Sequence, residues 1–339
     1  MLAYLTKQVK ERALVLDRFL TLCEVYDDAS ANPGAALHQE LVERCALGAN
    51  LTEEKVFRHC SVVTRLYGVY ESFAESVLSF WLARLPRYQA FTTLSPSFRN
   101  AYRCGIARII HNADKRQYRH IVIDNVLEKY LVSLRGESPW ELVGDALTAH
   151  ENNLRRSEFE QLFHAAGLDG VWAYLEKNEL LARLSTDADK SLEQMILELV
   201  IFRNEAAHGA PDDILGIDTL RQWIVFVNAF CDALADFLTH RIVREEAAYH
   251  PQTVYGTVTE TFKNRIAVAK CHCGTLNVGD YLYFLRATDC TYARIESLQV
   301  EGVNQQSVTI PRPDFEVGMQ TSIEVPKKAK LVKLDQQPQ

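Results

Sequence analysis

The first 250 residues carry apolar side chains at the three- and four-residue spacing of α-helices. Residues 62–85 give the clearest pattern, with apolar side chains at positions 63, 66, 67, 70, 74, 77, 78 and 81. The spacing recurs over 219–249, at positions 220, 224, 227, 231, 234 and 238. Residues 1–20 place charges between their apolar positions, which is typical of an amphipathic helix and not of a signal peptide. These patterns predict a helical domain over residues 1–250.

Two shorter segments of this domain carry helix-boundary signals. Asn152 and Asn153 precede the segment LRRSEFEQLFHAAGL and are expected to cap a helix there. Ser191 and Gln194 have the spacing of a capping box, which predicts the start of a further helix. We expect that helix to cover residues 192–208, because the Gly-Ala-Pro that follows combines a good helix terminator with a residue that cannot continue the helix.

Beyond residue 250 the helical spacing gives way to short segments rich in β-branched and aromatic residues. Seven such segments alternate with Gly, Pro and Asp turn signals: VYGTV, RIAVA, YLYFL, TYARIESLQV, SVTI, TSIEV and KLVKL. This pattern predicts a small antiparallel barrel over residues 252–335. The fold class expected for the chain is therefore mainly α, a helical bundle followed by a C-terminal antiparallel β-barrel.

The C-terminal segment is similar to the second domain of translation elongation factors. The residues that carry the similarity are Gly256–Val258, Val278–Tyr283, Tyr292–Gly302 and Val317–Met319. The GTPase part of those proteins is missing, because the chain contains no Gly-Lys dipeptide and hence no phosphate-binding P-loop. The resemblance implies contact with tRNA or the ribosome, or a protein-docking surface, and the sequence favours neither.

Charge is distributed unevenly along the chain, whose formal net charge is −7. Residues 84–120 contain eight Arg or Lys residues and one acid, a net charge of +7, so the remaining residues together carry −14. We interpret residues 84–150, which include this cluster, as a basic helical insertion in the bundle. A concentrated positive segment in an acidic protein favours a polyanionic partner.

The basic segment supplies the candidate RNA-binding residues, which are Arg99, Arg103, Arg116 and Arg119. Aromatic residues at positions 88, 91, 98, 102 and 118 are interleaved with the cations and are expected to stack on unpaired bases. The alternative is that these cations face the acidic stretch 121–250, which holds 23 acids and 11 bases. Both alternatives stay open at the level of sequence.

Nothing in the sequence indicates a membrane segment, a metal site or a cofactor. The longest apolar runs, such as 199–202 and 223–227, are far too short to span a bilayer. Eight cysteines show no pairing pattern, and only Cys271-His272-Cys273 approaches a zinc motif, without a second pair to complete it. We therefore expect reduced thiols, a cytoplasmic location, and neither a bound metal nor a nicotinamide or flavin cofactor.

The expected helix 192–208 contains one residue that breaks its apolar pattern. Its predicted buried track runs through positions 192, 196, 199, 203 and 206, so Arg203 occupies a position where an apolar residue is expected. The apolar run 199–202 surrounds the helix, which predicts that the helix is covered on more than one side. A guanidinium on such a face needs a partner or a polar cavity. His208 ends the helix, where the helix dipole favours its protonated form.

An arginine and a histidine together can cleave RNA without a metal ion. The reaction needs a base for the 2′-hydroxyl proton, an acid for the leaving 5′-oxygen, and a cation that stabilises the phosphorane. Histidine serves the first two roles and arginine the third. One Arg203 with one His208 supplies half of such a site, and a two-fold dimer that brings two copies together supplies the whole.

These residues resemble the signature of the HEPN ribonucleases, which is an Arg, a polar residue, and a His after four to six intervening positions. The chain reads RNEAAH over Arg203–His208, with the polar Asn204 in place and the shortest permitted spacing. The segment Tyr67–Phe73, residues 152–167 and the long helix after the motif also look similar to these domains. The resemblance covers residues from about 15 to 245 and is closest to the toxin-like and defence-associated branches.

The resemblance implies a four-helix core, dimerisation through the motif helices, and RNA products with 2′,3′-cyclic phosphate ends. It implies that His208 acts as acid and base, that Arg203 stabilises charge, and that Asn204 positions them. Glu71 is a further candidate, which either orients Arg203 or only neutralises it. The implied partners are RNA (tRNA or rRNA), a second copy of the chain, and an antitoxin or defence-system protein. The implied role is that of a toxin or an antiviral-defence effector.

Two other hypotheses account for the same residues. In the first, Arg203 serves packing alone, through a buried ion pair with Glu71 or Glu205, and the protein is a non-catalytic RNA- or protein-binding adaptor whose helical core only dimerises. In the second, the protein is a toxin held silent by a separate nucleotidyltransferase or antitoxin. Growth of an expression host separates the active nuclease from the adaptor, because only the nuclease is harmful.

Overall fold

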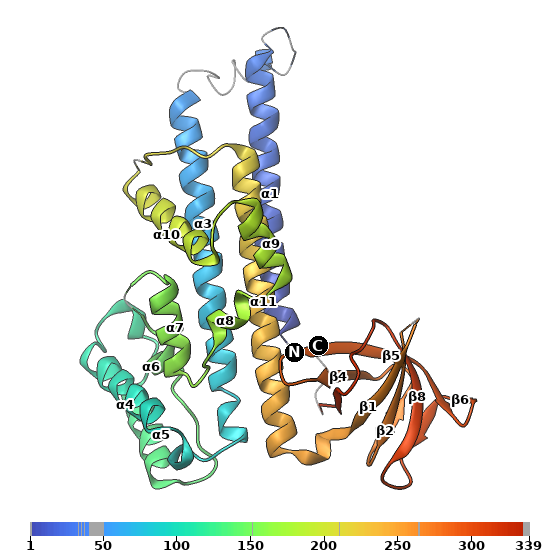
Figure 1. The fold of residues 1–339 in the computed structure, drawn as a ribbon. Helices are drawn as coiled ribbons and strands as arrows, with labels where there is room; N and C mark the ends of the chain where they lie inside the picture. Colours follow the sequence, from blue (N-terminus) through green and yellow to red (C-terminus); the bar gives the residue numbers. More distant parts are fainter. Residues whose placement is uncertain are drawn as a thin grey trace. The chain divides into compact units, whose positions relative to one another are not determined.

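A computed structural model of the protein describes residues 2–32, 34, 36, 38–40, 51–150, 152–209, 211–263 and 265–334. It is mainly α-helical and ends in an antiparallel barrel, so the predicted fold class is confirmed (Figure 1). Residue contacts divide the chain into two units, one formed by Tyr4–Ala235 and one by Asp236–Gln339 with Met1–Ala3. Helix α11 (Ile217–Tyr249) contributes its first part to the helical unit and its second part to the barrel unit.

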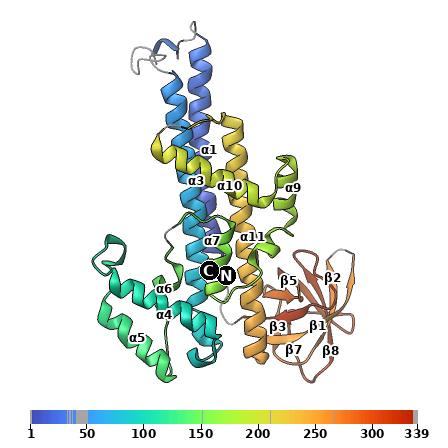
Figure 2. The same ribbon diagram turned by 60° about the vertical axis from the view of Figure 1, so that its left-hand side comes forward.

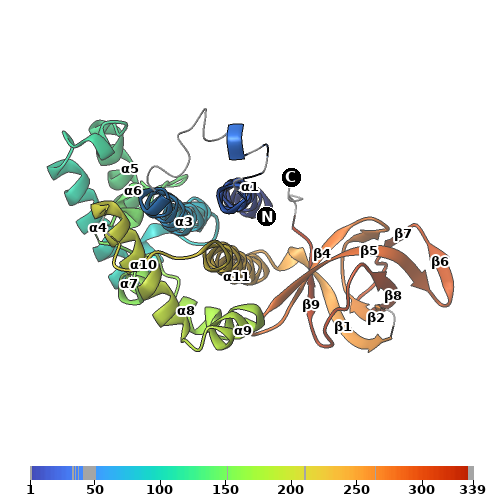
Figure 3. The same cartoon turned by 90° about the horizontal axis from the view of Figure 1, so that it is seen from above.

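Three long helices form the centre of the helical unit. They are α1 (Ala3–Ala31), α3 (Leu51–Leu82) and the first part of α11, which Figure 3 views nearly end-on. Their apolar faces meet in a core that includes aromatic rings, such as Tyr70 of α3, whose ring centroid lies 5.2 Å from that of Phe230 of α11. The helical spacing of residues 62–85 and 219–249 therefore predicted the central helices correctly.

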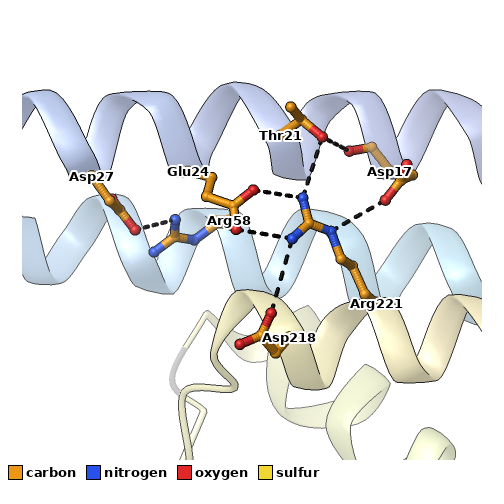
Figure 4. A network of polar contacts seen from close by, with 7 residues as sticks. All are labelled: Asp17, Thr21, Glu24, Asp27, Arg58, Asp218 and Arg221. Atoms are coloured by element: carbon orange, nitrogen blue, oxygen red, sulfur yellow. Dashed lines mark hydrogen bonds and ion pairs between the residues drawn. The ribbon is translucent and has the colours of Figure 1, made fainter.

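Ion pairs also join the three long helices (Figure 4). Arg221 of α11 donates to Glu24 of α1, with 2.7 Å between Nη2 and Oε2, and to Asp17 of α1, with 3.2 Å between Nε and Oδ1. Arg58 of α3 is 7% exposed and donates to Asp27 of α1 at 2.8 Å. Removal of Asp27 would leave a buried guanidinium without its carboxylate, which is the costly way to break such a pair.

Shorter helices connect α3 to the helix that carries the Arg-His motif. In chain order they are η1 (Leu85–Arg87), η2 (Phe91–Thr93), α4 (Pro96–His111), η3 (Arg116–Tyr118), α5 (Ile123–Arg135), α6 (Asp145–Thr148), α7 (Arg156–Ala165), α8 (Val171–Leu175) and α9 (Glu179–Asp187). Helices α4, α5 and α6 lie together (Figure 2). Gly105 allows α4 to approach α6, because a Cβ at this position would lie 1.9 Å from the carbonyl oxygen of Ala146.

The motif helix α10 (Leu192–His208) has the predicted ends. Ser191 accepts a hydrogen bond from the backbone of Gln194, whose side chain binds the backbone N–H of Ser191, so the capping box is confirmed. Gly209 ends the helix with a φ of 69°, a left-handed conformation that favours glycine. The prediction that α10 is covered on more than one side is wrong, because Leu197 and Ile201 are 41% and 40% exposed.

The start of α7 differs from its prediction. Asn152 and Asn153 were expected to cap this helix, but it begins at Arg156, after Arg155, and no side chain caps it. The amide of Asn153 instead donates to Asn204 in α10. The side chain of Asn153, which local sequence signals predicted to cap α7, thus forms a long-range hydrogen bond instead.

The barrel consists of six antiparallel strands in the order β4-β9-β1-β2-β8-β5, closed by pairing of β4 with β5. Strand β6 pairs with β5, and β3 and β7 form a separate two-stranded ribbon. The strands are β1 (Val254–Phe262), β2 (Ile266–Cys271), β3 (Thr275–Asn277), β4 (Tyr281–Leu285), β5 (Cys290–Val300), β6 (Val303–Gln305), β7 (Ser307–Thr309), β8 (Phe315–Thr321) and β9 (Lys330–Val332).

One predicted strand is misplaced. The segment TSIEV was expected to form a strand, but β8 covers the preceding residues and ends at Thr321. Val317, Met319 and Thr321 alternate into the barrel with at most 2% exposure, so the period-two pattern that fixes the strand lies before TSIEV. None of the helices in the described part of the chain combines the length and apolar character that a membrane span needs.

Candidate active site

Arg203 and His208 leave the motif helix in different directions. They are five positions apart, which on an α-helix is a rotation of about 140°. Arg203 is half-buried on the side of α3, whereas His208 is exposed at the last helical residue. The two side chains of a single copy therefore do not face the same point.

Arg203 is held by an aromatic ring and an amide. Its guanidinium carbon lies 5.4 Å from the centroid of the Tyr67 ring, and its Nη1 donates to Asn204 Oδ1 at 3.2 Å. Across the described ranges, no ion pair links Arg203 to an acid, so the buried ion pair with Glu71 or Glu205 is not formed. A π face and an amide oxygen stabilise the guanidinium without neutralising its charge. The cation is thus free to bind an anion.

Asn204 connects the motif to the loop that precedes α7. Its Oδ1 accepts from Arg203 and also from Nδ2 of Asn153, at 2.9 Å. The next residue of the loop, Leu154, donates its backbone N–H to the hydroxyl of Tyr67 at 3.0 Å, and its carbonyl accepts from the hydroxyl of Tyr70 at 2.8 Å. The loop therefore fixes both supports of Arg203, the Tyr67 ring and the Asn204 amide.

Glu71 contacts Tyr67, the residue whose ring supports Arg203. Its Oε1 accepts from the hydroxyl of Tyr67 at 2.9 Å. Burial raises the pKa of Tyr67 above its ordinary value, so the phenol stays protonated and keeps donating to the carboxylate. Glu71 thus orients the ring under Arg203 and does not bind the guanidinium itself.

His150, on the same loop, lies beside Glu71. Its Nε2 is 3.1 Å from Glu75 Oε1 and 4.0 Å from Glu71 Oε1, and its Nδ1 is 2.8 Å from the carbonyl oxygen of Asn152. The hydrogen bond with Glu75 raises the pKa of His150 above its ordinary value, against the opposing effect of burial. A protonated imidazole donates from both nitrogens and bridges the loop to two carboxylates of α3.

His150, the contact of Asn153 with Asn204 and the role of Tyr67 were not predicted from the sequence. The loop that carries His150 and Asn153 has neither helical nor strand spacing, and its contacts are with residues far away in sequence. Tyr67 was identified as an apolar helix position and as part of the segment that resembles HEPN domains, without a role in the site. No local signal separates its hydroxyl, which bonds to the loop, from that of any other core tyrosine.

His208 follows an exposed apolar stripe of α10, and Glu205 lies between the stripe and the histidine. Leu197, Ile201 and His208 fall within about 40° of one another around the helix axis. Leu197 and Ile201 keep 41% and 40% of their surface exposed, and His208 is exposed as well. One copy of the chain therefore presents an imidazole beside an uncovered apolar surface.

The aromatic residues of the basic segment are buried, which differs from expectation, whereas its cations are accessible. Arg103, Arg116 and Arg119 are exposed and Arg99 is half-buried, so these cations are accessible to different degrees. The interleaved aromatic residues are at most 5% exposed: Tyr88, Phe91, Phe98, Tyr102 and Tyr118. The expectation that they stack on bases is wrong, because they form the apolar core of the segment. Their spacing among the cations reflects helix packing.

The sulfur atoms of the Cys-His-Cys motif lie within the barrel. Cys271 is fully buried, which raises its pKa to about 12, and Cys273 is half-buried and donates to the carbonyl oxygen of Val254. In the part of the chain that the structure describes, no three His, Cys, Asp or Glu side chains are grouped so that they could hold a metal ion.

The helical unit that carries the Arg203 network matches a known family. A model of the family RiboL-PSP-HEPN matches residues 38–240, which include α3, α10 and the loop between α6 and α7. None of the curated proteins compared with the chain matches it. The match covers more than half of the chain and all residues of the Arg203 network. The resemblance to HEPN domains is thereby confirmed, and the chain belongs to the RiboL-PSP-HEPN family.

Proposed function

We propose that the protein is a metal-independent endoribonuclease. Membership of a HEPN family indicates a nuclease or another RNA-related role. The observation that carries the more specific proposal is the surroundings of Arg203, which is held by Tyr67 and Asn204 with no carboxylate partner among the described residues. Its charge is available to a phosphate, and a guanidinium suits the oxygens of a phosphate geometrically.

In the proposed reaction the 2′-oxygen of a ribose attacks the adjacent phosphorus atom. His208 of one protomer takes the 2′-hydroxyl proton, and the partner's His208 gives a proton to the 5′-oxygen as its bond to phosphorus breaks. Arg203 donates to the non-bridging oxygens, on which negative charge grows. The products are a 2′,3′-cyclic phosphate and a 5′-hydroxyl.

A two-fold dimer through α10 supplies the second histidine. The exposed stripe of Leu197 and Ile201 leads along the helix to His208, so covering the stripe with its own copy brings two imidazoles together. Burial of these two side chains also favours association. The occupant that we propose is a second copy, because one copy holds a single His208 and the reaction needs both an acid and a base.

Asn204 and Glu71 act on Arg203 in different ways in this proposal. Asn204 contacts the guanidinium and fixes its direction, with its own amide held by Asn153. Glu71 acts through the hydroxyl of Tyr67 and is a positioning residue. The proposal therefore keeps Arg203 and His208 as the groups that touch the phosphate and the reacting oxygens.

The RNA strand is proposed to extend onto the basic segment. The exposed guanidinium groups of Arg103, Arg116 and Arg119 are able to bind phosphates, and the half-buried Arg99 contributes less. The family resemblance favours a toxin or antiviral-defence effector that cuts tRNA or rRNA. The barrel is then a docking surface for tRNA, the ribosome or an antitoxin.

The proposal is tested by incubation of the purified protein with total RNA in EDTA. We expect cleavage that resists the chelator, leaves 2′,3′-cyclic phosphate ends, and is lost in His208→Ala and Arg203→Ala. His164→Ala is the matched control, because His164 is exposed and lies outside the network. Intact RNA at every protein concentration, with RNA still bound, would favour the non-catalytic adaptor. Cleavage that appears only after removal of a co-purified partner would indicate a silenced toxin.

A further inference from the structure

A cavity of about 460 Å³ lies beside the Arg203 network and has no role in the mechanism above. It is open to solvent on one side and is lined by residues of α4, α6, α7 and the loop that carries His150. Small side chains form much of its wall, among them Ala101 and Gly105 of α4, Ala149, and Ala165 of α7. Walls of this kind leave room for a flat group with apolar faces.

The polar groups of the cavity lie on a few of its residues. Arg108 donates from Nη2 to the carbonyl oxygen of Ala146 at 3.3 Å, and its buried Nε has no hydrogen-bond partner among the residues that the structure describes. The side-chain amides of Asn152 and Gln161 are exposed and, within the described part of the chain, make no hydrogen bond. Each amide offers both donors and an acceptor. The cavity therefore combines apolar walls with unpaired donors and acceptors.

The charges around the cavity favour a neutral ligand over an anion. Its lining includes one guanidinium, that of Arg108, and one carboxylate, that of Glu158. His150 contributes a cation when protonated, but its ring nitrogens are directed to Glu75 and to the carbonyl oxygen of Asn152. A phosphate would meet the Glu158 carboxylate here as well as the cations. A nucleobase has apolar faces and polar edges, which matches both features of the wall.

Contacts run from the cavity to the proposed cleavage site. His150 lines the cavity and lies 4.0 Å from Glu71, which accepts from Tyr67, and the ring of Tyr67 supports Arg203. A group bound in the cavity is thus connected to Arg203 through three side chains in series, His150, Glu71 and Tyr67.

We infer that this cavity binds a nucleobase, which belongs either to the RNA strand at the cleavage site or to a free nucleotide. The inference deepens the proposed function, on which it rests for the link to cleavage. Asn152, Gln161 and Arg108 pair with the polar edges of the base, and the alanine walls contact its faces. Because the cavity takes an unpaired base, a strand that enters it is single-stranded there.

The first test fills the cavity. His208→Ala keeps a fluorescein-labelled single-stranded octaribonucleotide intact, and fluorescence anisotropy measures its affinity. Adding Ala101→Trp should weaken binding roughly tenfold, the size of one lost base contact. Ala107→Trp, on the exposed side of the same helix and outside the cavity, should not change the affinity. Equal affinity of both variants, with unchanged thermal unfolding, would overturn the inference.

The second test uses Cys104, which is exposed and lines the cavity, as a reporter in the otherwise unchanged His208→Ala protein. Saturating octaribonucleotide should slow alkylation of Cys104 by iodoacetamide several-fold and leave the rate at Cys273 in the barrel unchanged. Each of the four ribonucleoside 5′-monophosphates is tested alone, and protection by one of them at similar concentration identifies a free nucleotide as the source. Alkylation of Cys104 at its free rate with all five ligands would overturn the inference. Because neither test needs cleavage, an inactive protein that binds in this way would refute only the nuclease.

Discussion

The guanidinium of Arg203 lies over the ring of Tyr67, with 5.4 Å between its central carbon and the ring centroid. The tyrosine hydroxyl is separately bonded to Glu71 and to the backbone N–H of Leu154. The ring and the hydroxyl therefore have distinct tasks. The ring supports a charge without neutralising it, and the hydroxyl fastens the ring to α3 and to the loop before α7.

The two tasks of Tyr67 are separated by two substitutions. Tyr67→Phe keeps the ring but leaves the buried N–H of Leu154 unpaired, which should lower the free energy of unfolding by about 1–3 kcal/mol. Tyr67→Leu also removes the π face, so cleavage per folded molecule should fall further than in Tyr67→Phe. Urea unfolding and RNA cleavage measure the two effects. Tyr130→Phe is the control, and equal activity of both Tyr67 variants would show that the ring has no part in placing Arg203.

Asn153 should act on cleavage through Asn204. Asn153→Ala removes the donor at 2.9 Å that fixes the Asn204 amide, so the amide that binds Arg203 can rotate. We expect the rate of cleavage to fall about tenfold, which corresponds to the loss of one hydrogen bond of about 1.4 kcal/mol in the transition state. RNA affinity, measured by anisotropy in the His208→Ala background, should change little. An effect on affinity alone would place Asn153 in RNA binding instead.

His150 should make stability depend on pH. Its pKa is raised by Glu75, and Glu71, Arg108 and Glu158 lie around it. A raised pKa in the folded state means that the stabilisation is complete below the unfolded value of about 6.5 and is lost as the pH rises through the folded value. The melting temperature of the native protein should therefore exceed that of His150→Gln most at about pH 6, and the difference should shrink toward about pH 9.

The measurement for His150 is thermal unfolding across this pH range, with His111→Gln as the control. His111 is exposed at the end of α4, so its replacement should leave the pH dependence unchanged. A difference between native protein and His150→Gln that stays constant with pH would mean that the imidazole contributes by packing and not by its charge.

The sequence predicted those parts of the site that depend on local signals. The capping box at Ser191 and the glycine at position 209 fix both ends of α10 and so the positions of Arg203 and His208 on it. The partner of Arg203 was not predicted, because Tyr67 lies on another helix and helical spacing only marks it as buried. His150 was missed for the same reason. Its partners are a carboxylate of α3 and a carbonyl of its own loop, and neither leaves a repeating pattern.

Two further predictions were wrong because burial depends on tertiary packing, which the sequence pattern does not show. Aromatic residues between cations look the same in a stacking surface and in a helix core, and the structure places Tyr102 and its neighbours in the core. The helix over residues 192–208 was expected to be covered on more than one side, but Leu197 and Ile201 on its outer face are exposed. Sequence periodicity gives the face of a helix, but not whether the chain itself covers that face.

The exposed basic residues should govern the salt dependence of RNA binding. Arg103→Ala, Arg116→Ala and Arg119→Ala should each weaken binding of a single-stranded oligonucleotide and lower the slope of log affinity against log salt by about 0.7. Arg183→Ala is the control, because Arg183 is exposed on α9 outside the basic segment. Anisotropy titrations in the His208→Ala background, at several salt concentrations, measure both quantities. Slopes unchanged in all three variants would exclude contact of this segment with phosphates.

The dimer should depend on the apolar stripe that leads to His208. Leu197→Glu places a charge at the proposed two-fold contact, so it should shift the protein to the monomer in analytical ultracentrifugation and abolish cleavage. Leu180→Glu on α9 is a matched control, because Leu180 has almost the same exposure, 40% against 41%. It should leave both the oligomeric state and cleavage unchanged.

A composite site also predicts how native and inactive subunits combine. When native protein is mixed with increasing His208→Ala protein under conditions of subunit exchange, only native pairs hold two complete histidines. Cleavage should therefore fall with the square of the native fraction. A linear fall would show that each copy acts alone, and then the dimer contact through the exposed leucine of α10 would not be needed for cleavage. The Leu197→Glu variant distinguishes this case, because a monomeric enzyme would keep its activity when the stripe is charged.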